Sequence, residues 1–478
     1  MDDLALLDAT AQAELVRRRE ASAAELVDAA ITRIEKLDGE LNAVVIPRFE
    51  RAREAAGRHD LPDGPFRGVP FLTKDLWCVT KDEPLTNGMR FLKDAGFVAR
   101  DDSHLARRWR EAGFVNLGFT NSPELGLLPT TEPEAYGPTH NPWDLERTPG
   151  GSSGGSCAAV AAGLTPIAHA SDGGGSIRIP ASCCGLVGLK PSRGRVSNGP
   201  QGGDLTRFLS VQLGVSTSVR DVAALLDVAA GPEPGDAIIA PAPARPFADE
   251  VGADPGRLRV GIATSLGGNE TERQCVDATE QAGRLLESLG HHVEVAHPPD
   301  LDDRANGVGF MAVWMTNAAA ALATWGAMVG RDVSEADVEP LTWAQAEQGR
   351  TLSALRYVDA LNQMQAFTRR VAQWWQDGFD LLLTPTVAHP PPRLGELPPR
   401  GDNPLADYGR VVAFVPFTPA FNVTGQPAVS LPLGSSADGL PIGVQLVAAY
   451  GREDMLIRVA AQLETAAPWA DRRPPVHA

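Results

Sequence analysis

The stretch TPGGSSGGSCAAVAAGL (residues 148–164) is rich in glycine and serine and runs directly into helix-forming alanines. Such a composition is typical of a flexible linker. A linker would separate two domains, however, and here a second glycine cluster, SDGGGSIRIPAS (171–182), follows closely. We therefore weigh three further interpretations: a phosphate-binding loop, the nucleophile turn of an α/β-hydrolase, and a serine site built from both clusters.

The first two of these interpretations lack residues that they need. A phosphate-binding P-loop ends in Gly-Lys-Ser or Gly-Lys-Thr, and neither cluster contains a lysine. The α/β-hydrolase pattern G-x-S-x-G is matched at Ser152 and at Ser153. That turn needs a strand in front of the serine, whereas residues 141–150 are typical of turns. His389, which such a triad could use, is expected to be exposed in the loop-like sequence TVAHPPPR.

Composition narrows the class of protein. The 478 residues are 43% hydrophobic and 22% charged, as in soluble globular proteins. A net charge of −17 argues against general binding to nucleic acid or to anionic membranes. No run is long and apolar enough to span a bilayer, and the acidic N-terminus lacks the basic start of a signal peptide.

The cysteines and histidines indicate a reduced, metal-free protein. The five cysteines have no paired spacing, which predicts reduced thiols and a cytoplasmic location. Adjacent Cys183 and Cys184 are expected to fill buried space. Because no metal-ligand spacing occurs, we expect neither a metal nor another cofactor.

Hydrophobic patterns predict alternating helices and strands. Ser22 and Glu25 form a capping box, after which apolar residues from Leu26 to Leu37 recur at helical spacing. The alternation predicts an α/β fold around one twisted sheet. The proline-rich segment 231–256 is either a domain linker or a surface excursion. Strands are predicted at 42–47, 68–77, 113–120, 257–264, 292–297, 379–386, 428–433 and 443–449, and further helices at 103–113 and 271–289.

Lysine is scarce in this chain, where it supplies five of the 43 basic residues. Lys74 ends the apolar segment GVPFLTK (68–74), where a lysine is unexpected unless it has a chemical role. Lys190 also lies near the second glycine cluster and is interpreted as structural. The remaining lysines, Lys36, Lys81 and Lys93, are expected on the surface.

Both glycine clusters and the Lys74 segment together resemble the amidase signature family. The matching segments are GGSSGGS (150–156), DGGGSIRIPAS (172–182) and GLVGLKPSRGRVS (185–197). Ser152 and Ser176 stand 24 positions apart, as the two signature serines do in that family. The likeness continues through NPWD (141–144) and GLPIGVQLVA (439–448), so it spans nearly the whole chain.

The resemblance implies the architecture of this family. The expected fold is the α/β amidase signature fold, in which one large twisted mixed β-sheet is surrounded by α-helices. A single domain is expected over residues 1–478. Its signature core would cover about residues 65–200, and a helical region at about 300–375 would border the substrate pocket.

The resemblance also implies a Ser–cis-Ser–Lys triad. Ser176 would be the nucleophile, Ser152 the bridging serine after a cis peptide from Gly151, and Lys74 the base. Lysine accepts a proton only when it is neutral, so burial must lower its pKa from about 10.4. Arginine could not replace it, because a guanidinium keeps its proton in proteins. An oxyanion hole is expected from the backbone N–H groups of Gly173, Gly174, Gly175 and Ser176.

Other residues receive roles from the same resemblance. Asp172 and Arg178 are expected to hold the nucleophile loop by hydrogen bonds. Ser153 either donates to the triad or caps the following helix. Four residues are expected to face the substrate: Gly126, Leu127, Trp314 and Met315.

Within the family, segments such as WWQDGFDLLLTPT (374–386) resemble the 6-aminohexanoate-cyclic-dimer hydrolases. Amide hydrolysis of small molecules is therefore expected, with aryl amides and carbamates as further substrate classes. The partner is a small-molecule amide, with no nucleic acid and no membrane, and a homodimer stays open. The alternatives are the glutamine-hydrolysing subunit of a tRNA-dependent amidotransferase and an inactive binding protein on the same fold.

Overall fold

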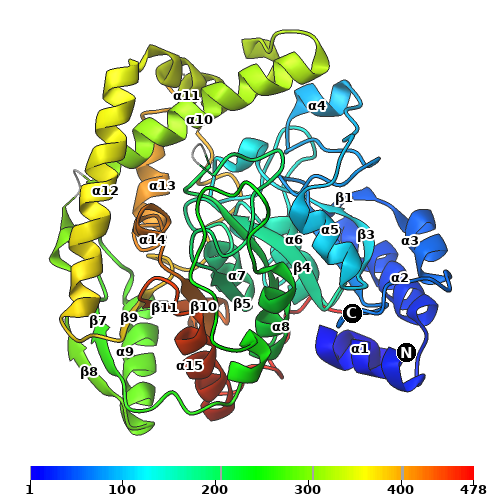
Figure 1. Ribbon diagram of the computed structural model, residues 1–478, viewed down its shortest axis with the longest axis horizontal. Helices are drawn as coiled ribbons and strands as arrows, with labels where there is room; N and C mark the ends of the chain where they lie inside the picture. Colours follow the sequence, from blue (N-terminus) through cyan, green and yellow to red (C-terminus); the bar gives the residue numbers. More distant parts are fainter. Residues whose placement is uncertain (1, 205–206, 304–305, 400–402) are drawn as a thin grey trace.

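One mixed sheet of 11 strands runs through the molecule, in the order β1-β3-β2-β4-β6-β5-β10-β11-β9-β7-β8 (Figure 1). The computed structural model describes residues 2–204, 207–303, 306–399 and 403–478. The strands are β1 (Val44–Pro47), β2 (Pro70–Lys74), β3 (Val115–Thr120), β4 (Ile167–Asp172), β5 (Val187–Lys190), β6 (Val211–Ser216), β7 (Arg259–Ile262), β8 (His292–Val295), β9 (Leu381–Pro385), β10 (Ala428–Ser435) and β11 (Pro441–Ala448).

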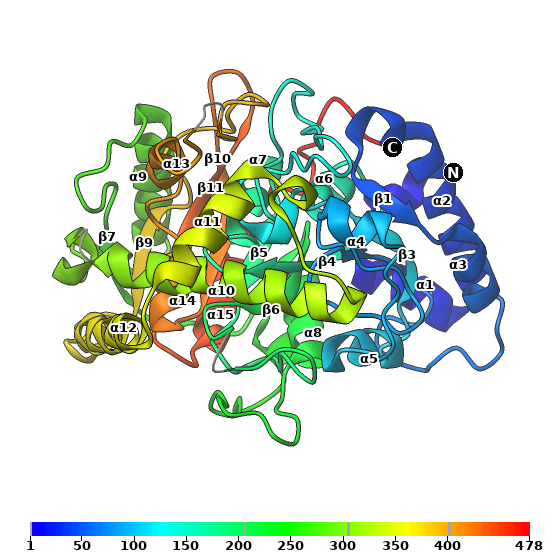
Figure 2. The ribbon, with the colours of Figure 1, turned by 90° about the horizontal axis from the view of Figure 1, so that it is seen from above.

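Helices surround this sheet. α6 and α7 pack against each other and against the central strands, and α8 and α15 form a second such pair. Figure 2 shows the two pairs on opposite sides of the sheet. The helices are α1 (Ala9–Arg18), α2 (Ala23–Leu41), α3 (Phe49–Ala56), α4 (Arg90–Asp94), α5 (His104–Glu111), α6 (Gly154–Ala161), α7 (Arg178–Cys184), α8 (Val219–Ala229), α9 (Arg273–Ser288), α10 (Asn306–Val329), α11 (Pro340–Thr351), α12 (Ala354–Gln376), α13 (Tyr408–Phe414), α14 (Ala420–Thr424) and α15 (Glu453–Ala466).

The predicted α/β architecture is confirmed, and so are its local signals. Ser22 accepts from the backbone N–H of Glu25, and the Glu25 carboxylate accepts from the backbone N–H of Ser22, so α2 begins at the predicted capping box. β7 and β8 pair in parallel around α9, as the pattern over 257–297 predicts. The unpredicted strands are the central β4, β5 and β6.

The proline-rich segment 231–256 is a surface excursion. It joins α8 to β7, and both β6 before it and β7 after it belong to the same sheet. Its one short helix, η3 (Phe247–Glu250), packs against α8 and α15.

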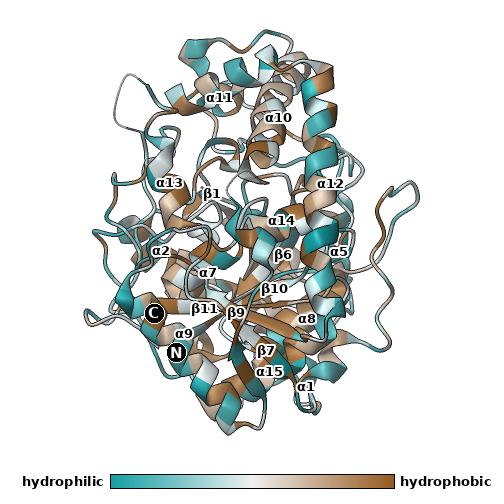
Figure 3. Ribbon diagram, turned by 90° about the vertical axis from the view of Figure 1, so that its left-hand side faces the viewer, coloured by the Kyte–Doolittle hydropathy of each residue, from teal (hydrophilic) through white to brown (hydrophobic). Residues whose placement is uncertain are grey.

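Helix α10 corrects the expectation that no segment is apolar enough to cross a bilayer. Residues Gly307–Val329 have the length and the mean hydropathy (1.3) for it. Alanine and glycine dilute the apolar character of this segment, so its sequence pattern is easily missed. In this structure α10 packs against α11 and α12, and Figure 3 shows its largely hydrophobic surface beside the mixed surface of α12.

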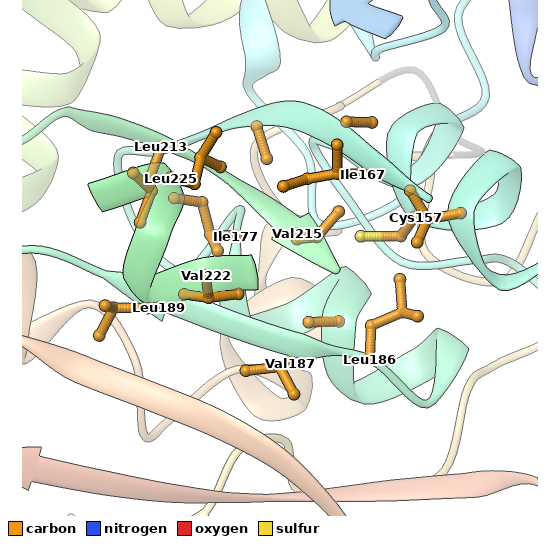
Figure 4. Close-up of a cluster of buried hydrophobic side chains, with 14 of the residues drawn as sticks. Cys157, Ile167, Ile177, Leu186, Val187, Leu189, Leu213, Val215, Val222 and Leu225 are labelled. Atoms are coloured by element: carbon orange, nitrogen blue, oxygen red, sulfur yellow. The ribbon is translucent and has the colours of Figure 1, made fainter. Parts of the chain in front are cut away.

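The main hydrophobic core lies between the central strands and the helices that cover them. Figure 4 shows a part of it in which Leu213 and Val215 of β6 meet Val222 and Leu225 of α8. Leu213 and Leu225 are fully buried. Side chains of the central strands point to both faces of the sheet, and packing on both faces holds β4 and β6 in place next to the glycine clusters.

We predict that Leu213→Ala lowers the free energy of unfolding by about 2–5 kcal/mol, because the deletion leaves a cavity in a close-packed core. Denaturant unfolding followed by tryptophan fluorescence measures the loss. The matched control is Leu355→Ala on α12, where the leucine is 83% exposed; it should change the free energy by less than about 0.5 kcal/mol. Equal effects of the two changes would contradict the assigned core.

Candidate active site

The carboxyl ends of three strands meet at one edge of the sheet. β2 pairs in parallel with β3 and with β4, and Lys74 lies opposite Thr120 in the first pairing. Parallel neighbours end at the same edge, so Lys74, the last residue of β2, comes close to Asp172, the last residue of β4. The two glycine clusters lie near this edge. The first leads into α6, which starts at Gly154, and the second leads into α7, which starts at Arg178.

The Lys74 amine binds three serine hydroxyls, and no carboxylate in the described parts of the chain pairs with it. Its Nζ lies 2.8 Å from Ser152 Oγ, 2.9 Å from Ser153 Oγ and 3.0 Å from Ser171 Oγ. Ser153 precedes α6 but makes no side-chain cap hydrogen bond. Of the two interpretations of Ser153, the geometry therefore favours the one in which it contacts the predicted triad.

Burial lowers the pKa of Lys74 to about 7, although the negative charge of Asp172 opposes this shift. The side chain is completely buried. A neutral amine has a lone pair that can accept a proton, so near neutral pH a substantial fraction of Lys74 is able to act as a base. The three surface lysines are exposed as predicted, and Lys190 is buried, with its Nζ donating to the Pro191 carbonyl.

Ser171 and His169 belong to this site and were not recognised in the sequence. They stand two residues apart on β4 and therefore share one face of the strand. The backbone N–H of Lys74 donates to His169 Nδ1 at 3.3 Å. Burial and the nearby Lys74 lower the pKa of His169 to about 3, so the imidazole is neutral. Alternation of polar and apolar residues in IAHASD (167–172) was the available signal.

Two glycines allow the chain to approach the serines closely. The peptide between Gly151 and Ser152 is cis. A Cβ on Gly151 would lie 2.5 Å from the backbone of Thr130. Gly126 has a φ of +72°, and a Cβ there would lie 3.1 Å from Ser152 Oγ. A larger residue at either position would displace the segment that presents Ser152.

A buried ion pair organises the loop that carries Ser176. Arg178 Nε lies 2.9 Å from Asp172 Oδ2, and both side chains are fully buried. Burial raises the pKa of Asp172, but the charge and hydrogen bonds of Arg178, together with the charge of Lys190 and a hydrogen bond from Asn422, outweigh burial and lower the pKa to about 2. Asn422 and Gln445 accept from the same guanidinium at 2.8 and 2.7 Å. Asp172 and Arg178 thus hold the loop through hydrogen bonds, as the sequence led us to expect.

The backbone donors of the loop divide into two groups. The N–H of Gly175 donates to Asp172 Oδ1 at 2.7 Å, which removes it from the predicted set of oxyanion donors. The N–H groups of Gly173, Gly174 and Ser176 make no hydrogen bond with any residue that the structure describes. Three of the four predicted donors are therefore available to a ligand.

The serines open into a small inner cavity, which shares a wall with an outer cavity of about 300 Å³. Trp77, Leu125, Arg207, Ser210 and Trp314 line both. The other residues of the inner cavity are Leu76, Gly126, Ser152, Ser171, Gly173, Ser176, Asn198 and Gln212.

The four residues expected to face the substrate differ in whether they line the two cavities. Gly126 and Trp314 line the inner cavity, and Leu127 lines the outer one. Met315 lines neither; its carbonyl lies against Gly349 of α11. The expectation that Met315 faces the substrate therefore stays a prediction.

His389, the histidine that an α/β-hydrolase triad could use, lies away from the serines. His389 is half-buried rather than exposed and packs against Phe414, with ring centroids 4.6 Å apart. It lines neither cavity. Over the described ranges, no three His, Cys, Asp or Glu side chains are grouped so that they could hold a metal ion.

We predict that Arg178→Met lowers the free energy of unfolding by about 3–5 kcal/mol, because it leaves the Asp172 carboxylate buried without its cation. Denaturant unfolding measures this loss. Arg58→Met is the matched control, since Arg58 pairs with Asp60 on the surface, where an ion pair contributes at most about 1 kcal/mol. A loss no larger than in the control would show that the Asp172–Arg178 pair does not organise the loop.

Comparison with known proteins identifies relatives over nearly the whole chain. The model of the Amidase family matches residues 25–457. The 6-aminohexanoate-cyclic-dimer hydrolase of Paenarthrobacter ureafaciens is 46% identical and covers 98% of this chain and 96% of its own length. The corresponding enzyme of a Pseudomonas strain, NK87, is 45% identical with the same coverage.

Solved structures agree with these sequence relatives. A structure of 6-aminohexanoate cyclic dimer hydrolase has a TM-score of 0.95, with 44% identity and 99% coverage of both chains. A bacterial aryl acylamidase of the amidase signature family has a TM-score of 0.87, with 28% identity and 97% coverage of both chains. A glutamyl-tRNA(Gln) amidotransferase subunit of Thermotoga maritima follows at 0.81, with 28% identity and 99% coverage of both. The chain therefore belongs to the amidase signature family.

Proposed function

We propose that this protein is a serine hydrolase that cleaves the carboxamide C–N bond of small molecules through an acyl-enzyme. The observation that carries the proposal is the 2.8 Å contact between Lys74 Nζ and Ser152 Oγ beside a cavity that Ser176 also lines. A serine hydroxyl attacks an amide only if a base removes its proton during the attack. Ser176 is the nucleophile, Ser152 the bridge and Lys74 the base.

The proton follows the two hydroxyls in both halves of the reaction. Ser176 Oγ bonds to the amide carbon while its proton passes to Ser152, and the Ser152 proton passes to Lys74. When the C–N bond breaks, the same route returns a proton to the leaving nitrogen, which departs as an amine. Water then attacks the ester of Ser176 along this path and releases the carboxylic acid.

The developing negative charge on the carbonyl oxygen needs donors fixed in advance. The N–H groups of Gly173, Gly174 and Ser176 supply them, while Asp172 and Arg178 keep their loop in place. Such preorganised donors stabilise the transition state because they need not reorient as charge appears. Losing one donor costs about 3–4 kcal/mol in known enzymes.

The relatives suggest the substrate class. Cyclic amides of 6-aminohexanoate come first, because a sequence relative with 46% identity and a structural relative with 44% identity are named as hydrolases of the cyclic dimer. Linear amides of 6-aminohexanoate contain the same kind of bond and come next. Aryl amides and carbamates follow. Glutamine hydrolysis for an amidotransferase is less favoured, since the Thermotoga maritima protein is only 28% identical and the cavities here carry Trp77 and Trp314 on their walls.

We also propose one domain over residues 1–478 and a cytoplasmic location. The single sheet takes strands from Val44 to Ala448, which supports one folding unit. All five cysteines are free and buried, which supports a reducing environment.

Ser176→Ala should reduce turnover of 6-aminohexanoate cyclic dimer to background while the protein stays folded, because it removes the hydroxyl that is proposed to form the acyl-enzyme. Product release is measured by mass spectrometry, and labelling by a fluorophosphonate should be confined to the wild type. Ser288→Ala, at an exposed serine on α9, is the control. A tenth or more of normal activity in Ser176→Ala would show that another residue is the nucleophile.

Lys74 should give the reaction its pH dependence. Only the neutral amine accepts a proton, so kcat/KM should be low when Lys74 is protonated and rise with pH through about 7. Lys74→Arg keeps the charge but removes the base, and it should lower kcat/KM by several orders of magnitude. Lys81→Arg, at an exposed lysine, is the control. An active Lys74→Arg variant with the wild-type pH profile would reduce Lys74 to an electrostatic role.

A further inference from the structure

Arg207 stands out among the residues that line the cavities. It borders both the inner cavity with Ser176 and the outer cavity, and no other described residue on either lining has a charged side chain. The remaining walls consist of apolar, aromatic and neutral polar groups, so one cation dominates the field inside. The cavities thus carry a positive charge in a chain whose net charge is −17.

The Arg207 guanidinium has an aromatic neighbour but no acidic one. Its Cζ lies 3.8 Å from the centroid of the Trp77 ring. None of the ion pairs found in the described parts of the chain includes it. Burial lowers its pKa to about 10, which still leaves it protonated at neutral pH. Stacking on Trp77 leaves the N–H edge of a planar guanidinium open to a ligand.

Three other buried or half-buried arginines of this protein have protein partners. Arg178 pairs with Asp172, and Arg195 with Glu453. Arg193 instead donates to backbone carbonyls of Phe208, Asn422 and Val423. Arg207 is half-buried and lacks such partners among the described residues, so its donors are free to bind an acceptor that a ligand brings into the cavity.

We propose that Arg207 is a specificity-determining residue that binds a carboxylate of the substrate while the scissile amide lies at Ser176. The inference rests on the proposed amide hydrolysis and adds a preference within it: amides that also carry a carboxylate, such as linear amides of 6-aminohexanoate, are cleaved more efficiently than neutral amides of the same length. A guanidinium binds a carboxylate through two parallel hydrogen bonds, which gives both attraction and orientation.

The carboxylate can belong to either half of the substrate, and matched substrates distinguish the two. N-hexanoyl-6-aminohexanoate carries it on the leaving amine, and the monohexylamide of hexanedioic acid carries it on the acyl group. N-hexylhexanamide has the same length and no charge. For the wild type we expect kcat/KM for one of the two acids to exceed that for the neutral amide by about 10- to 100-fold.

Variants assign that preference to Arg207. In Arg207→Gln the ratio of acid to neutral amide should fall to near 1, and in Arg207→Lys, which keeps the charge but not the paired donors, it should fall only in part. The control is Arg350→Gln, because Arg350 also stacks on a tryptophan, with its Cζ 4.8 Å from the Trp343 ring, but borders neither cavity. This variant should keep the wild-type ratio.

The wild type alone also tests the proposal, so the test does not depend on the folding of a variant. Hexanoate should inhibit turnover of the neutral amide competitively and at least tenfold more strongly than hexanamide. If neither acid is preferred, or if Arg207→Gln keeps the preference, the proposal is overturned while turnover of the neutral amide leaves amide hydrolysis standing. If no amide is cleaved and a fluorophosphonate fails to label Ser176, both this proposal and the proposed function are overturned.

Discussion

An amine held in a dry environment is the constraint on which the site depends. Lys74 is fully buried, and the negative charge of Asp172 is already matched by Arg178. Removing an ammonium from water without a dedicated counter-ion is expensive, which lowers the pKa of Lys74 to about 7, and the protein surrounds this amine with hydroxyls. Each of the three serine contacts can accept from the amine or donate to it, which suits a group that gains and loses a proton.

This requirement explains why elements far apart in the chain must meet. Ser152 and Ser153 arrive from the turn before α6, and Ser171 arrives from β4, 97 residues after Lys74. The parallel pairing of β2 with β4 sets the height of both strands at the edge of the sheet. The Asp172–Arg178 pair then holds the loop that follows β4, so that strand pairing and one ion pair together place Lys74 and the loop that carries Ser176.

The sequence predicted the outer parts of the sheet better than its centre. Strands such as β9 and β11 are largely apolar, and hydrophobic patterns detect them. β4 and β6 contain small and polar residues, and β4 turns His169 and Ser171 toward Lys74 rather than toward the core. The roles of Lys74, Asp172 and Arg178 were inferred from a family resemblance, whereas Arg207 lies in a segment without a motif and needed three-dimensional contacts to be noticed.

Arginine supplies most of the basic surface, and this choice affects how the protein can be attached to a solid support. Aldehyde or activated-ester supports react with amines, and the exposed lysines are confined to Lys36, Lys81 and Lys93. Lys93 is further occupied, since its Nζ lies 4.2 Å from the centroid of the Tyr136 ring. All three lie in the first hundred residues, around α2 and α4 (Figure 1). Coupling through side-chain amines would therefore anchor the molecule at few points on its N-terminal side, and the buried Lys74 would be out of reach of the reagent.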